Sequence, residues 1–143
     1  MQNPMSTIAI IGRPNVGKST LFNKLLGKNK AIVAKVAGVT RDFQIEKVSW
    51  EGYSFHIVDT SGFEIKKDDL LQLLIQKQYE RLLDRVDGFL FLCDGQSETT
   101  QLDHELLQKI RRKNKPMIKV VNKIDTTYFK THEAEFFEFF RFI

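Results

Sequence analysis

The sequence lacks any long hydrophobic run and any second cysteine. No apolar stretch approaches the roughly 20 residues that a membrane-spanning helix needs, so we predict no transmembrane segment. Residues 1–7 are short and polar, without the apolar segment of a secretory signal, so we expect no such signal here. The single cysteine, Cys93, excludes an intramolecular disulfide. These absences are typical of the reducing cytoplasm, where we expect the protein to be.

The sequence also has no internal repeat, no low-complexity linker and no strong excess of either charge. Its 22 basic and 18 acidic side chains leave a net charge of +4, which is compatible with a nucleic-acid neighbour but usual for a folded domain. The histidines His56, His104 and His132 are scattered without the spacing of metal ligands, so we expect no metal site on them. With 42% hydrophobic residues, residues 1–143 are expected to form one domain with its own core.

What is present is an alternation of β-branched runs with helical periodicity, which favours an α/β fold with a mostly parallel sheet. The expected strands are 7–11, 43–50, 53–58, 88–93 and 117–121, with a hairpin turn at Glu51-Gly52. The expected helices are 17–26, 69–85, 98–113 and 131–142, and the aperiodic segment 28–42 is expected to be a loop. The apolar runs of 88–93 and 117–121 predict strands buried on both faces.

These ranges give five strands, with the hairpin counted as two, and four helices. The last expected helix has no strand after it, whereas a βα domain of this type normally continues. We therefore expect the C-terminal part of the fold to be missing from these 143 residues.

The most specific local pattern follows the first strand and opens the first helix. It reads Gly12-Arg13-Pro14-Asn15-Val16-Gly17-Lys18-Ser19-Thr20. Gly12 and Gly17 allow close approach of the backbone, so that successive N–H groups, including those of Asn15 and Val16, can surround phosphates. Lys18 would neutralise the β and γ phosphates. The pattern predicts a nucleoside triphosphate site in a three-layer P-loop NTPase fold, but it does not separate ATP from GTP.

Two hydroxyl residues complete the phosphate site. Ser19 offers an oxygen ligand to Mg²⁺, a hard cation that prefers oxygen, and Thr20 would reach the α phosphate.

A second pattern, Asn122-Lys123-Ile124-Asp125, follows the last expected strand. Open parallel sheets bind ligands at this end of their strands. The carboxylate of Asp125 has only acceptors and would pair with the N1–H and 2-amino groups of guanine, which adenine lacks. Asn122 would bind the other edge of the base and Lys123 would lie over its plane. This pattern therefore selects GTP, which makes the expected P-loop fold small GTPase-like, and it disfavours a P-loop kinase or ATPase.

The segment Asp59-Thr60-Ser61-Gly62 ends the expected strand 53–58. Asp59 would hold Mg²⁺ through water, and the Gly62 N–H would contact the γ phosphate and lose that contact after hydrolysis. Thr40, in the aperiodic loop, is a candidate for a second Mg²⁺ ligand. A loop threonine satisfied by backbone explains Thr40 equally well.

These motifs together resemble the N-terminal GTPase domain of the Der (EngA) family over nearly the whole chain. Besides the motifs already given, the resemblance rests on 31–42, Val58-Asp59-Thr60-Ser61-Gly62-Phe63-Glu64, Leu102-Asp103-His104-Glu105 and 115–125. It implies a GTP-binding and GTP-hydrolysing switch that assists assembly of the large ribosomal subunit, with ribosomal RNA as partner. It also implies a second GTPase domain and a KH-like domain outside this sequence. An Era-like or MnmE-like GTPase acting on rRNA or tRNA is the alternative within this group.

The sequence departs from the family at Ser61, where Der usually has glycine, which removes a second flexible position. The Ser-Ala signature that contacts the base in the family is also absent, because the sequence ends at Ile143. Phe63 stands where many small GTPases carry the glutamine that orients water. The family instead uses K⁺ held by a phosphate-loop asparagine, which Asn15 matches. The expected catalytic set is therefore Lys18, Asn15, Thr40 and Gly62, with Mg²⁺ and K⁺.

Several features keep two interpretations. The chain could bind GTP yet hydrolyse it little, and Arg41 is a structural loop residue or an internal arginine finger. The basic cluster 111–115 is solvated charge at a helix end or an rRNA contact. The phenylalanines of 136–140 are a core stripe or a partly exposed face. Cys93 is expected in the core.

Overall fold

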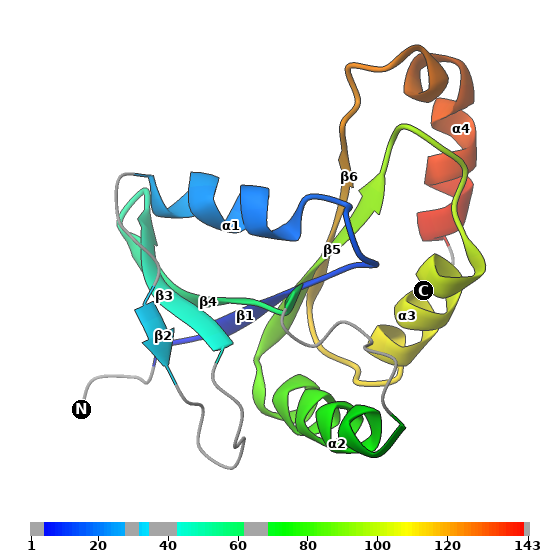
Figure 1. Ribbon diagram of the computed structural model, residues 1–143. Helices are drawn as coiled ribbons and strands as arrows, with labels where there is room; N and C mark the ends of the chain where they lie inside the picture. The colour runs from blue at the N-terminus through cyan, green and yellow to red at the C-terminus, as the bar shows by residue number, and fades with distance from the viewer. Residues whose placement is uncertain (1–4, 28–31, 35–42, 62–68, 142–143) are drawn as a thin grey trace.

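The computed structural model describes residues 5–27, 32–34, 43–61 and 69–141. In these ranges the strands are β1 (Thr7–Ile11), β2 (Ile32–Ala34), β3 (Phe43–Trp50), β4 (Tyr53–Asp59), β5 (Gly88–Asp94) and β6 (Met117–Asn122). The helices are α1 (Lys18–Leu26), α2 (Asp69–Arg85), α3 (Gln101–Arg111) and α4 (Thr127–Arg141). Figure 1 shows them arranged around one twisted sheet.

The sheet has the strand order β2-β3-β4-β1-β5-β6. Strands β4, β1, β5 and β6 are parallel, and β3 runs antiparallel to both β2 and β4. The chain moves to one side of β1 for β2 to β4 and to the other side for β5 and β6. The carboxyl ends of the parallel strands β1, β4, β5 and β6 therefore share one edge, where open α/β sheets bind ligands. The mostly parallel α/β sheet predicted from the sequence is confirmed.

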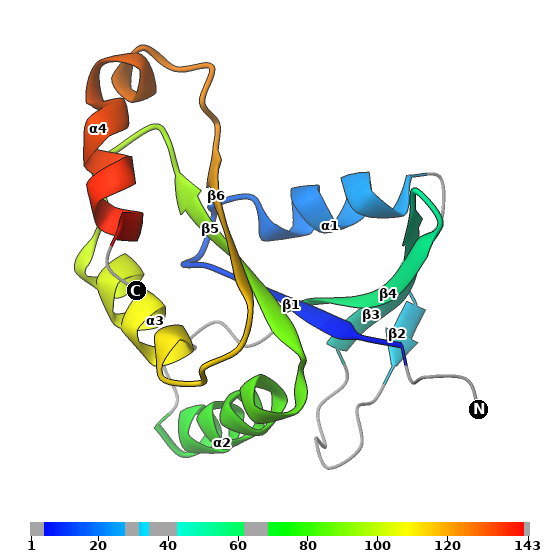
Figure 2. The same ribbon diagram turned by 180° about the vertical axis from the view of Figure 1, so that it is seen from behind.

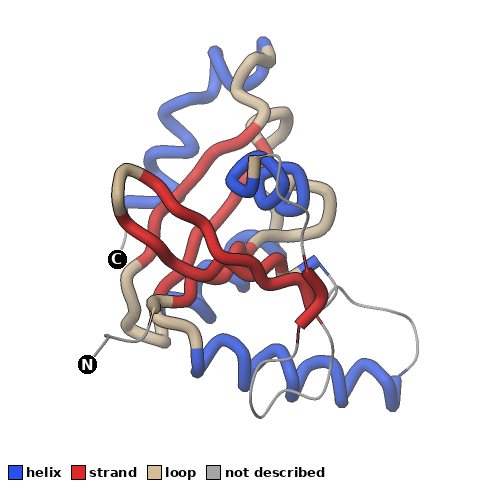
Figure 3. Tube along the Cα trace, turned by 90° about the vertical axis from the view of Figure 1, so that its left-hand side faces the viewer, coloured by secondary structure: helices blue, strands red, loops and turns tan. Residues whose placement is uncertain are grey.

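Alternate residues of the central strands point to opposite faces and create two hydrophobic clusters. Ile10 of β1 and Leu92 of β5 pack with Phe22 of α1. Their neighbours Ile11 and Phe91 belong to the cluster that includes residues of α2, α3 and α4. Figures 1 and 2 show α1 on one face and α2 and α3 on the other, and Figure 3 shows the twist of the strands between them. The structure thus has the three predicted layers.

The predicted hairpin at Glu51-Gly52 is confirmed by its backbone. Glu51 has φ of 48° and Gly52 has φ of 85°, the left-handed region that a two-residue turn with both φ values positive requires. The turn joins β3 and β4, which pair from Gln44↔Asp59 to Trp50↔Tyr53.

The sequence prediction was wrong at two helix starts. The third helix begins at Gln101 rather than residue 98, because Thr100 and Asp103 form a capping box that fixes its first turn. The fourth begins at Thr127 rather than residue 131, because the Thr126 hydroxyl accepts from the Phe129 N–H at 3.3 Å. The β-branched and aromatic residues of that first turn hid the helical periodicity. The helix is also kinked at His132, which has φ of −121° and ψ of 17°.

Two strand predictions need correction. The segment 28–42, predicted as a loop, contains β2, which pairs with β3 from Ile32↔Ile45 to Ala34↔Phe43; the rest of this segment lies outside the described residues. Burial on both faces is confirmed for β5 but wrong for β6, where Ile118 is 64% exposed. β6 pairs only with β5 among the described strands, and an edge position leaves its side chains partly exposed.

Cys93 is fully buried in the cluster that contains Phe91, as expected. Burial, with the nearby charge of Asp103, raises the pKa of its thiol, which therefore stays neutral. The aromatic stripe of α4 is mainly core, since Phe136 and Phe139 are buried, but Phe137 is 68% exposed. None of the helices in the described ranges has the length and apolar character that a bilayer crossing demands.

The basic cluster 111–115 includes two lysines with structural contacts. Lys113 Nζ pairs with Asp84 at 2.7 Å and Glu80 at 3.0 Å, and its hydrogen bond to Asp84 is the main cause that raises the pKa of Lys113. Lys115 Nζ donates to the carbonyls of Leu83, Asp84 and Val86 at 2.8, 2.6 and 2.7 Å. These carbonyls lie in the last turn of α2 and just after it, where helix carbonyls lack partners within the helix and attract cations. Lys115 therefore caps α2.

We predict that Lys115→Met lowers the free energy of unfolding by about 2 kcal/mol, because hydrogen bonds from a charged donor are among the stronger ones and the freed carbonyls are partly buried. The matched control is Lys77→Met, which removes the same charge from an exposed position on α2. Chemical denaturation of both variants measures the difference. Equal stability of the two variants would contradict the capping role.

Candidate functional site

Three of the sequence motifs meet at the carboxyl edge of the parallel strands, where the end of β5 joins them. The phosphate loop follows β1, Asp59 ends β4, Asp94 ends β5 and Asn122 ends β6. The register places Ile10 beside Asp59 and Asp94 beside Asn122. Residues more than a hundred positions apart in the chain therefore line one site.

Gly17 lies at the start of α1 in a conformation that favours glycine. Its φ is 106°, and a Cβ at this position would collide with Nδ2 of Asn122. Gly17 is the N-cap of α1, and no side chain caps the helix there. A helix N-terminus that no side chain caps presents its backbone N–H groups in a direction that favours an anion.

Lys18 is 97% buried, with an exposed fraction of 3%. Its ammonium donates to the carbonyls of Gly12 at 2.9 Å and Arg13 at 2.8 Å. The Lys18 side chain thus folds back along the loop that precedes α1, and its charge lies beside the backbone carbonyls of that loop. An anion at the N-terminus of α1 would meet this charge.

Ser19 and Asp59 are brought together as predicted for a Mg²⁺ site. The Ser19 hydroxyl donates to Asp59 Oδ2 at 2.7 Å and lies 3.1 Å from the Ser61 hydroxyl. Ser61 in turn donates to Asp59 Oδ1 from its hydroxyl at 2.7 Å and from its N–H at 3.0 Å. These are oxygen donors of the kind Mg²⁺ prefers, and only one of them is charged, so the set fits an ion that also takes phosphate and water ligands.

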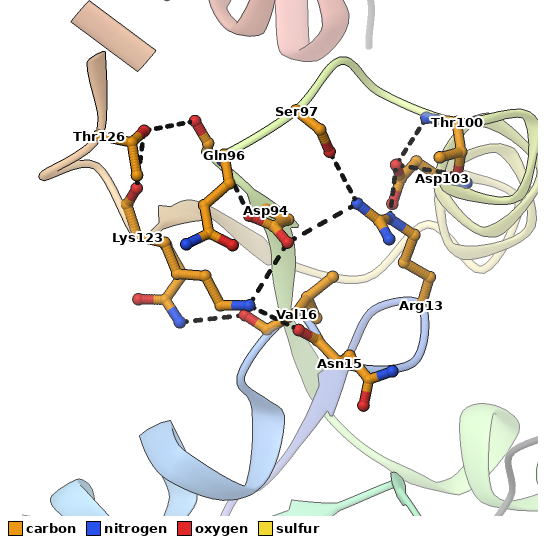
Figure 4. Close-up of polar contacts among 12 residues, drawn as sticks. Arg13, Asn15, Val16, Asp94, Gln96, Ser97, Thr100, Asp103, Lys123 and Thr126 are labelled. Carbon is orange, nitrogen blue, oxygen red and sulfur yellow. Dashed lines mark hydrogen bonds and ion pairs between the residues drawn. The ribbon is translucent and has the colours of Figure 1, made fainter. Parts of the chain in front are cut away.

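We call residues 12–19 the phosphate loop and residues 122–125 the base loop. The two loops are in direct contact. Asn122 Nδ2 donates to the Val16 carbonyl at 3.0 Å, and Lys123 Nζ donates to the Asn15 carbonyl at 2.8 Å (Figure 4). Asn15 and Lys123 both have positive φ, 67° and 60°, which is uncommon outside glycine. Each loop therefore holds the other in a conformation that would be unfavourable alone.

Sequence reasoning missed Gly95, which follows β5 and lies against the backbone of the base loop. Its N–H donates to the Asn122 carbonyl at 2.7 Å, and a Cβ there would lie 2.7 Å from that oxygen and 3.2 Å from the Lys123 carbonyl. The Thr126 hydroxyl donates to the Gly95 carbonyl at 3.0 Å. The glycine after the acidic end of an apolar strand was the available indication of such a close approach.

Thr60 was named only as part of its motif, but it has an anchoring role. It is buried, and its hydroxyl donates to the Ile10 carbonyl at 2.6 Å. This bond ties the end of β4 to β1 just before Ser61. No local pattern distinguishes such a threonine from one that faces solvent.

A hollow of about 390 Å³ opens between the two loops. It is lined by Asn15, Gly17, Lys18, Ser19, Thr20, Ser61 and Lys123. Asp125 is exposed, two residues beyond Lys123 in the same loop. The arrangement offers a cation, backbone donors and hydroxyls at one end and a carboxylate near the other. Thr40, Gly62, Phe63 and Arg41 lie outside the described residues, so their predicted roles stay predictions.

The sequence matches the family described as 50S ribosome-binding GTPase over residues 7–123. The chain belongs to that family. It is 45% identical over 132 residues to GTPase Der of Porphyromonas gingivalis, an alignment that covers 92% of this chain and 30% of the relative. The chain therefore spans less than a third of the length of this relative, and the N-terminal Der resemblance is confirmed.

Solved structures agree with the sequence relatives. An Era variant from Aquifex aeolicus bound to GDP and aluminium fluoride superposes with a TM-score of 0.74 at 32% identity, covering 97% of this chain and 48% of that one. Era in complex with MgGDPNP and a segment of 16S ribosomal RNA gives a TM-score of 0.73 at 31% identity, covering 98% and 48%. The P-loop GTPase fold predicted from the sequence is confirmed.

We predict that Gly95→Ala weakens GDP binding about tenfold, a loss of about 1.4 kcal/mol, because the added Cβ pushes the Asn122–Lys123 backbone off the phosphate loop. The control is Gly88→Ala at the other end of β5, where a Cβ would lie 3.0 Å from the Pro116 carbonyl. Both variants should lose stability in thermal unfolding, but only Gly95→Ala should lose affinity in a fluorescent-GDP titration at a temperature where both are folded. A similar affinity loss in both would refute the assignment.

Proposed function

We propose that this domain binds GTP and GDP with Mg²⁺ and hydrolyses GTP. The observation that carries the proposal is the contact of the base loop with the phosphate loop, Asn122 to Val16 and Lys123 to Asn15. One ligand with a base at one end and phosphates at the other spans this pair of loops. The GDP and GDPNP complexes of the two Era neighbours support this choice of ligand.

Guanine follows from Asp125. Its carboxylate offers acceptors to the N1–H and 2-amino groups of guanine, and adenine would leave it without donors. The proposed nucleotide-binding set is Gly12, Asn15, Val16, Gly17, Lys18, Ser19, Thr20, Asp59, Gly62, Asn122, Lys123 and Asp125.

For hydrolysis, the residues of the chain position phosphates and neutralise charge. Lys18 lies where its ammonium can leave the carbonyls of Gly12 and Arg13 for the β and γ phosphates, and the N–H groups of α1 hold the anion. Ser19 and Asp59, with Thr40, would hold Mg²⁺, which when bound neutralises negative charge on the phosphates. The Asn15 side chain, exposed at the hollow, would hold K⁺ and, with Gly62, act near the γ phosphate.

One observation favours the second candidate, a GTP-binding module with little hydrolysis of its own. The Ser61 hydroxyl bonds to Asp59 and contacts Ser19, so Ser61 competes with Mg²⁺ for both proposed metal ligands. Breaking these bonds would accompany Mg²⁺ binding. Slow turnover in the isolated domain is consistent with this arrangement.

In the cell we propose that the domain serves as a switch in large-subunit ribosome assembly in the cytoplasm, within a longer protein. The Der relatives and the family description support this role, and the Era complex with 16S ribosomal RNA supports an RNA neighbour. An Era-like role on rRNA is the alternative, because the chain shares its fold with Era.

The guanine assignment is tested by Asp125→Asn. The amide exchanges a carboxylate acceptor for a donor and matches the 2-oxo group of xanthine, so preference should shift from GDP to XDP by about a hundredfold or more. Titration of both nucleotides against the variant and wild type measures this shift. Asp84→Asn, an exposed carboxylate at the end of α2, serves as control and should leave the preference unchanged. An unshifted preference in Asp125→Asn would remove Asp125 from the base site.

The K⁺ assignment predicts faster GTP hydrolysis in KCl than in NaCl at equal ionic strength. A K⁺ ion would add positive charge where other GTPases use an arginine finger, which is worth about 10³–10⁵ in rate, so a clear stimulation is expected. Phosphate release measured in both salts, with Asn15→Ala as the variant that loses the stimulation, tests it. Equal wild-type rates in the two salts would contradict K⁺ at Asn15.

A further inference from the structure

The carboxylate of Asp94 lies between the base loop and the phosphate loop at the end of β5. Its side chain is only 12% exposed. Oδ1 accepts from the Gln96 N–H at 2.8 Å, and Oδ2 faces two cations, Lys123 Nζ at 3.4 Å and Arg13 Nη2 at 3.9 Å. Figure 4 shows the carboxylate between these two side chains. One from each loop, the cations converge on a single, largely buried anion.

Arg13, the cation from the phosphate loop, also contacts α3. Arg13 Nε donates to Asp103 Oδ2 at 3.2 Å, and Asp103 is 1% exposed. The same carboxylate closes the capping box of α3 through the Thr100 N–H at 2.8 Å. Arg13 is therefore fixed at its far end by a buried partner on a rigid helix, so the position of Asp94 relative to the phosphate loop is also fixed.

Lys123, the cation from the base loop, has an unfavourable backbone conformation. Lys123 has φ of 60°, and its ammonium spans from Asp94 Oδ2 to the Asn15 carbonyl. Without the negative charge at Asp94, Lys123 and Arg13 would face each other as two cations with no anion between them. Like charges brought together in a partly buried site repel strongly.

We propose that Asp94 is a specificity-determining positioning residue, which holds the base loop in register with the phosphate loop so that Asp125 meets the 2-amino group of guanine. Asp94 acts through Lys123 and Arg13 and not by contact with the base. The inference rests on the proposed guanine-nucleotide function and extends it. A base loop that is no longer held in this position would still accept a purine. The Asp125 carboxylate, however, would no longer be placed to accept from both donors of guanine.

The test compares GDP with IDP, which differ only in the 2-amino group. In Asp94→Asn the amide still accepts from Gln96 but carries no charge for the two cations. We expect GDP affinity to fall about tenfold and the preference for GDP over IDP to fall at least about threefold. A loss of folded protein scales both dissociation constants equally and cancels in their ratio. The ratio therefore separates positioning from stability.

The matched control is Asp87→Asn, which removes a carboxylate just before β5, at the opposite end of that strand, where Asp87 accepts from the Thr7 N–H at 2.7 Å. The control should retain the wild-type ratio. Arg13→Gln and the double variant Arg13→Gln/Asp94→Asn complete a cycle in which the effects should be non-additive, because both remove the same connection.

The outcomes are distinct. A wild-type chain that fails to bind GDP overturns the proposed function and this inference with it. A wild type that prefers GDP, with an unchanged GDP-to-IDP ratio in Asp94→Asn or with additive effects in the cycle, leaves the function in place and overturns the role of Asp94.

Discussion

The hydrogen bond from the Asn122 amide to the Val16 carbonyl, 3.0 Å long, is the contact on which the rest of the site depends. It joins the end of β6 to the loop after β1, two strands that do not touch and are separated by β5. Gly17 is the residue that permits it, because a Cβ there would occupy the place of the Asn122 amide. This hydrogen bond thus sets the distance between the two loops that would hold the phosphates and the base.

The other contacts stabilise this one. Gly95 lets β5 approach the backbone of the base loop from below, and Thr126 ties the start of α4 to the Gly95 carbonyl. On the other side, Thr60 ties the end of β4 to β1. Buried polar groups of this kind are satisfied within the protein, and loss of one partner costs more than the bond itself contributes. The strand ends at this edge of the sheet are therefore connected to one another by hydrogen bonds within the protein.

Much of this could be predicted from the sequence, and the reason is chemical. Lys18, Ser19, Asp59 and Asp125 each have a proposed role that only a few residue types can fill at a set distance from a strand end. Asp94 and Gly95 were missed because their role depends on which strands are neighbours, and a sequence does not display strand order. The same ignorance of order made β6 look buried, and the short strand β2 lacks enough residues to show a period of two. Thr126 was missed because a capping hydroxyl has no pattern beyond itself.

The cap at the end of α2 has a mechanical consequence. Lys115 and Lys113 fasten the last turns of the helix, where Leu82 and Leu83 are also buried, whereas Leu73 and Leu74 nearer its beginning are more than half exposed. Ile75, nearer the beginning, is buried in the same cluster as Leu82 and Leu83, so apolar packing holds both halves of α2. The lysine contacts add to this hold at the end of the helix. We therefore expect α2 to fray from its beginning rather than from its end.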